Sequence, residues 1–125
     1  MKKFLIAVAA VLAFAPAAAQ AQTMTVADFL RRSDAASAAG IGPDTPEYQR
    51  LGRELNESAK LARNERRLAR RENREPRACL NPSLRATTQS ELFAHLRSIP
   101  AAEAQSTTVH QAYMQLMARK FPCRR

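Results

Sequence analysis

The segment at residues 62–77, ARNERRLARRENREPR, contains seven arginines, and no other segment has side chains so clearly suited to binding charged groups. Several recur at intervals of three and four residues, which places them on one face of a helix: Arg63, Arg66 or Arg67, Arg70 and Arg74. Guanidinium groups recognise carboxylates and phosphates. The candidate partner-binding residues are therefore Arg63, Arg67, Arg70 and Arg74. The simpler alternative is a solvated face that binds nothing.

Nucleic acid is the least favoured of the anionic partners. Proteins that bind single strands interleave cations with aromatic side chains on which bases stack, but residues 49–92 contain no Phe, Tyr or Trp. The chain has sixteen arginines and four lysines, a bias that a GC-rich genome produces without selection for binding. We expect a protein partner or an anionic polymer of the cell envelope, and no nucleic acid.

The sequence offers few candidate catalytic residues. His95 and His110 each fall at the border of an apolar helix face, and neither has a carboxylate three or four residues further along. A nucleophile requires a positioned base, and no such pair can be nominated. The three glycines that follow residue 21, Gly40, Gly42 and Gly52, do not form a phosphate-binding loop. The pattern favours a protein that is not an enzyme and uses no cofactor or metal.

The first 22 residues, MKKFLIAVAAVLAFAPAAAQAQ, are organised as a secretory signal peptide. Two lysines precede an apolar run of eleven residues, Phe4–Phe14, which is too short to span a bilayer. The triplet AQA at residues 19–21 then provides a small-x-small cleavage site. We predict a signal peptide at 1–21 and a single helical domain at 22–125, with no transmembrane segment after cleavage. An N-terminal membrane anchor is the alternative.

The signal is short, as bacterial signals are, so we expect the periplasm or the extracellular space. Its removal would take away two lysines and lower the net charge from +9 to +7. In an oxidising compartment the two cysteines, Cys79 and Cys123, are expected to form a disulfide. A redox or metal site is the alternative, but neither cysteine has C-x-x-C spacing. Such a crosslink would stabilise the fold by roughly 4 kcal/mol.

Apolar periodicity and capping residues predict four helices: 26–39, a long helix within 44–77, 89–98 and 109–120. The long helix would begin after Thr45, with Pro46 at its first position, and run to about Arg74. Its arginine-rich second half would leave the core as a polar arm. The last two helices would form an antiparallel hairpin, bracketed by the disulfide at 79–123. We therefore predict an all-α fold, a small bundle of about four helices.

The stretch from Cys79 to Cys123 resembles the C-terminal half of the type VI secretion amidase immunity proteins. The resemblance rests on Cys79, Pro82, Thr88, Glu91, Leu92, Leu96, Pro100 and the closing Phe121-Pro122-Cys123. It covers about 45 of the 104 residues that would remain after signal cleavage. Members of that family are small helical periplasmic proteins that bind and block peptidoglycan-cleaving amidase toxins delivered by neighbouring cells. The resemblance implies an immunity protein with a secreted amidase as its partner.

Two other functions are compatible with a small, exported, helical chain. A periplasmic acid-stress chaperone would titrate many carboxylates as the pH falls, but the mature chain would carry eleven acids against eighteen bases. A protein that binds an anionic envelope polymer would need only the arginine-rich helix. The predicted function is an exported binding protein, with the immunity role as the first interpretation and these two as alternatives.

Overall fold

A computed structural model of the chain describes residues 24–80 and 87–124, so the predicted signal peptide lies outside the described residues. The described part holds five helices: α1 (Val26–Ala38), α2 (Pro46–Arg71), α3 (Gln89–Ser98), α4 (Ala101–Ala104) and α5 (Val109–Lys120). It contains no β-strand, which confirms the all-α prediction. The helices α3 and α5 have the predicted bounds. The single-turn helix α4 was not predicted, because four residues are too few to show a period.

Each of the four longer helices begins after a threonine whose side chain accepts a hydrogen bond from a backbone amide of the first turn: Thr25, Thr45, Thr88 and Thr108. At α3 and α5 the third helical residue, Glu91 or Gln111, bonds back to the capping threonine and completes a capping box. A threonine cap typically contributes about 1 kcal/mol relative to alanine. These four caps therefore set where the helices begin.

The helix α2 ends at Arg71, earlier than the predicted Arg74, because Asn73 adopts a left-handed conformation with φ 51°. The amide of Asn73 donates to the Arg70 carbonyl at 3.3 Å, and the amide of Arg74 donates to the Ala69 carbonyl at 2.9 Å. This is the Schellman arrangement, with asparagine in the position that glycine usually occupies. The chain then turns back along α2 as residues 72–80, which we call the return segment.

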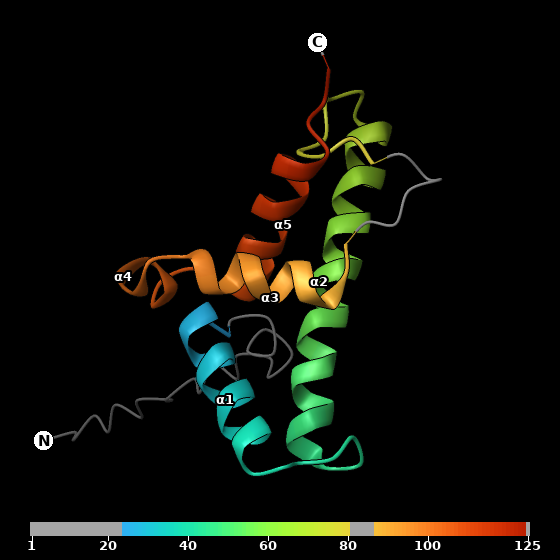
Figure 1. Cartoon of the computed structure of the whole chain (residues 1–125). Coiled ribbons are helices and arrows are strands. Elements are labelled where there is room, and N and C mark those ends of the chain that lie inside the picture. The colour runs from blue at the N-terminus through green and yellow to red at the C-terminus, as the bar shows by residue number, and fades with distance from the viewer. Residues whose placement is uncertain (1–23, 81–86, 125) are drawn as a thin grey trace, which may run out of the picture.

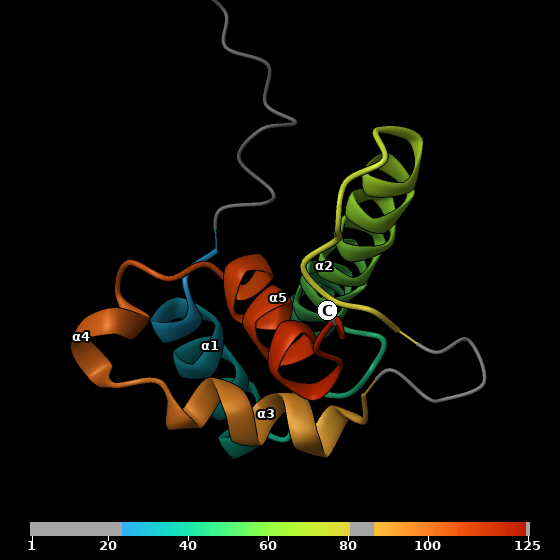
Figure 2. The ribbon, with the colours of Figure 1, turned by 90° about the horizontal axis from the view of Figure 1, so that it is seen from above.

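The helix α5 occupies the middle of the bundle, with α1 and α3 on one side and α2 on the other (Figures 1 and 2). Half of its residues are buried: Val109, Ala112, Tyr113, Met114, Leu116 and Met117. Its most extensive contact is with α2. Two segments far apart in sequence also meet where α1 and α5 begin, since Val26 N–H donates to the Thr107 carbonyl at 2.8 Å and Val109 N–H donates to the Met24 carbonyl at 3.0 Å.

The predicted C-terminal hairpin is present as two contacting helices, α3 and α5, but they cross each other instead of running antiparallel (Figures 1 and 2). Helix α4 and its flanking turns lie between them in sequence, and the chain re-enters the bundle at an angle. The predicted disulfide joins Cys79 to Cys123, with 5.0 Å between the Cα atoms. It ties the return segment to the end of α5, and the Cys79 amide donates to the Phe121 carbonyl at 2.9 Å.

The second half of α2 extends away from the other helices, as the polar-arm prediction implied (Figure 2). It is not bare, however, because the return segment covers one side of it. Ala69 is fully buried, and Ala78 of the return segment is 1% exposed. The disulfide holds this covering segment in place, so the arm is a supported part of the fold.

We predict that replacing Cys79 and Cys123 with serine lowers the free energy of unfolding by up to about 4 kcal/mol, the value that the chain-entropy model gives for this loop length. The helical content should persist, because the apolar contacts of α5 do not involve the disulfide. Urea unfolding followed by circular dichroism, with and without reductant, measures both quantities. The reduced natural chain should match the serine variant. Equal midpoints for the oxidised natural chain and the serine variant would contradict the prediction.

Candidate functional site: a cationic face on helix α2

One flank of α2 carries a row of six exposed cations, which we call the cationic face: Arg53, Lys60, Arg63, Arg67, Arg70 and Arg71. Because a helix turns about 100° per residue, these six positions fall within an arc of about 100°. From residue 53 to residue 71 they extend about 27 Å along the helix axis. No Asp or Glu of α2 falls in this arc, so the face carries one sign of charge over its whole length.

Most acidic side chains of α2 and of its C-cap residue form ion pairs on the opposite flank. Their ion pairs are Glu47 with Arg32 at 3.4 Å, Glu65 with Arg74 at 2.9 Å and Glu72 with Arg74 at 2.7 Å. Glu54 is buried, and burial raises the pKa of its carboxyl group. Glu57 is the exception, since it contacts Lys60 at 2.7 Å at the edge of the cationic face. The helix therefore separates its two signs of charge around its circumference.

Three of the four predicted partner-binding residues, Arg63, Arg67 and Arg70, lie on the cationic face and are exposed. Arg74 does not lie there. It follows the end of the helix, and its guanidinium group contacts the carboxylates of Glu65 and Glu72. The geometry thus groups three of the candidates and assigns Arg74 an ion-pairing position in the return segment.

Three members of the cationic face were not among the predicted partner-binding residues: Arg53, Lys60 and Arg71. The signal that could have identified two of them is the spacing of residues 53, 60 and 67, because positions seven residues apart lie on one flank of a helix. Within residues 24–80 and 87–124, no ion pair involves Arg53, Arg63, Arg70 or Arg71. These guanidinium groups remain available to an external anion.

The two histidines are packed between helices. His95 is 7% exposed, and its Nδ1 lies 3.0 Å from Nη2 of Arg119 on α5. Burial, with the Arg119 charge adding to it, lowers the pKa of His95. Burial also lowers the pKa of His110, and the nearby Arg77 acts in the same direction. Each imidazole therefore has a cation as its charged neighbour, an arrangement that favours the neutral ring.

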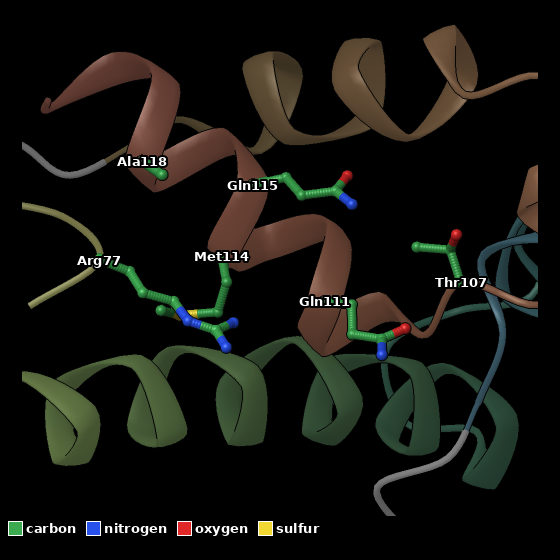
Figure 3. Close-up of a pocket in the computed structure, with 6 residues that line it drawn as sticks. All are labelled: Arg77, Thr107, Gln111, Met114, Gln115 and Ala118. Carbon is green, nitrogen blue, oxygen red and sulfur yellow. The ribbon is translucent and has the colours of Figure 1, made fainter.

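A hollow of about 500 Å³ lies between α5 and the return segment (Figure 3). Its lining residues are Arg77, Thr107, Gln111, Met114, Gln115 and Ala118. In Figure 3 the Arg77 side chain runs beneath α5 toward Met114, and Gln111 points toward α2. This lining offers one guanidinium group, two amides and one hydroxyl, which can hydrogen-bond a ligand or contact an anion. It does not pair a nucleophile with a base.

Among the described residues, no three His, Cys, Asp or Glu side chains lie together as a metal ion would require. No helix in the described ranges is both long and apolar enough to cross a bilayer. Compared with known proteins, the sequence matches no family model, no curated protein and no solved structure.

We predict that the fold loses stability as the pH falls below about 6.5, the ordinary pKa of histidine. The folded state holds both imidazoles at a lowered pKa, so the unfolded chain takes up protons first and is favoured by acid. Urea unfolding between pH 7 and pH 5 measures this slope. The double variant His95→Gln, His110→Gln should show a flatter slope. An unchanged slope would show that the histidines do not contribute.

Proposed function

We propose that this protein is an exported binding protein and that the cationic face of α2 is its contact surface for an acidic partner protein. The observation that supports this most is the separation of charge on α2. Six exposed cations share one flank, while the acids of the same helix are mostly engaged on the other flank. A solvated helix that only kept the chain soluble would gain more from mixed signs, because pairs of opposite charge three or four residues apart stabilise helices.

Arginine is the cation best suited to such a surface. Its planar guanidinium group can bond a carboxylate through two parallel N–H groups, and it is enriched at the energetic centres of protein interfaces. Five of the six cations on the face are arginines. A face of one sign also accelerates encounter with a partner of the opposite sign, an effect that weakens as salt is added. Binding through this face should therefore be fast and sensitive to ionic strength.

The more specific form of the proposal is an immunity role in the periplasm. Its supports are the predicted signal peptide and the resemblance of the Cys79–Cys123 stretch to the amidase immunity proteins. In this role the protein would bind a secreted peptidoglycan amidase and keep it from its substrate. Helix α2 suits this task, because its second half is covered by a return segment that the disulfide ties to the end of α5, and a surface that is already ordered loses little conformational freedom on binding.

We predict that the double charge reversal Arg63→Glu, Arg70→Glu weakens binding to the amidase by roughly two orders of magnitude, mainly through lost steering and repulsion between like charges. The matched control is Arg31→Glu, Arg124→Glu. It changes the net charge equally at two exposed residues away from the cationic face. The control should bind within a few-fold of the natural chain. Isothermal titration at two salt concentrations gives both affinities.

The biological readout is rescue of cells that express a peptidoglycan amidase in the periplasm. The natural chain and the control variant should prevent lysis, and the Arg63/Arg70 variant should not. If no tested amidase is bound or neutralised while purified lipopolysaccharide or peptidoglycan binds tightly, the anionic-envelope function replaces the immunity role. If the Arg63/Arg70 variant protects as well as the natural chain, the cationic face is not the contact surface.

A further inference from the structure

We infer that the docking surface continues from the cationic face toward the start of α2, with Tyr48 as an apolar anchor. The partner would then present an apolar patch beside its acidic groups, as a folded protein does. This inference rests on the proposed function, and it specifies the chemistry of the partner. The residues that carry it share one narrow strip of the helix: Tyr48, Gly52, Ala59, Arg63 and Arg70.

Tyr48 is the first observation. Its side chain is 49% exposed, and only Leu68, at 47%, joins it as an exposed large hydrophobic residue in the described ranges. At about 100° per residue, Tyr48 lies within about 60° of Arg63 and Arg70 around the helix. Leu68 lies roughly 160° away from Tyr48, on another flank. Tyrosine is one of the residue types most often found at the energetic centre of an interface, since it pairs an apolar ring with a polar tip.

Gly52 is the second observation, independent of the first. It lies inside α2, where glycine is among the least favourable residues. Among residues 24–80 and 87–124, no contact requires a glycine at this position. Its φ is not positive, and a Cβ built on it would meet no atom within 4 Å. Glycine commonly marks a place where a backbone is approached closely. A partner surface that lies against the helix at Gly52 would account for a residue that the fold itself does not need.

The strip is also continuous. One turn after Tyr48 comes Gly52, and two turns later comes Ala59, which is half-buried, so only small side chains separate the tyrosine from Arg63. From Tyr48 to Arg70 the distance along the axis is about 33 Å. Arg63 and Arg70, which form no ion pair among the described residues, lie toward one end of the strip, and the ring of Tyr48 lies at the other.

This arrangement discriminates between two kinds of partner. A polyanion such as lipopolysaccharide is held mainly by the cations and releases counterions when it binds. Its affinity should depend on Arg63 and Arg70 and should be indifferent to Gly52. A protein that packs against the strip must also fit over Tyr48 and the open position at Gly52. The inference therefore predicts that side-chain shape at residues 48 and 52 matters to binding.

The test uses the full chain with four single variants and the amidase that it neutralises in the rescue assay. Tyr48→Ala should lower the affinity at least tenfold. Gly52→Trp should lower it further, because the new ring occupies the space where the partner would lie. Leu68→Ala is the matched control on the other flank, and it should bind within about twofold of the natural chain. Gly52→Ala adds one methyl group where the partner approaches the backbone, so it should lower the affinity severalfold, less than Gly52→Trp. Circular dichroism should show that all four variants remain folded.

The inference is overturned if Tyr48→Ala and Gly52→Trp bind the amidase like the natural chain while Arg63→Glu, Arg70→Glu does not, an outcome that leaves the proposed function standing.

A second measurement covers the case in which no amidase binds. A photoreactive residue at position 48, compared with one at position 68, is irradiated in the exporting cell. Crosslinking at 48 to an acidic protein, abolished by Gly52→Trp, supports the inference without the immunity role. Binding to purified lipopolysaccharide alone, unchanged by Gly52→Trp, overturns both.

Discussion

The interior position of α5 is the constraint on which the rest of the structure depends. Its buried residues face several directions around the helix, so one neighbour cannot cover them all. Helices α1, α2 and α3 each cover part of its circumference (Figure 2). Burial of this kind contributes about 25 cal/mol for each Å² of apolar surface removed from water. Helix α2 is longer than the stretch required to cover α5, and its outer flank takes no part in the core.

The positive charge of α2 is concentrated on this outer flank. A helix that must cover a core with one side can place any residue on the other without altering the packing. Here the acids turn toward α1 or the return segment, where arginines such as Arg32 and Arg74 meet them. The cations on the far side have few such partners. The cationic face therefore results from two separate features. Helix α2 is longer than α5, and the return segment supplies countercharges to only one flank of α2.

The elements could be predicted from local signals, and their arrangement could not. Threonine caps identified where the four longer helices begin, because capping depends on a few adjacent residues. The end of α2 was missed, since asparagine is a less frequent left-handed residue than glycine and Asn73 gave a weaker signal. The crossing of α3 and α5 depends on turns that have no period. The pairing of Arg74 with Glu65 depends on where the return segment runs, which spacing along a helix cannot show.

The backbone pairing between the beginnings of α1 and α5 has a consequence for how the chain folds. The first amides of a helix have no acceptor within it, and here Val26 and Val109 each find one in the other segment. Some 83 residues separate Thr25 from Thr108, and contacts between such distant segments form slowly. We therefore expect α1 to dock against α5 late in folding. Its amides should exchange with solvent sooner than those of α5, and its departure would expose one side of the central helix to proteases.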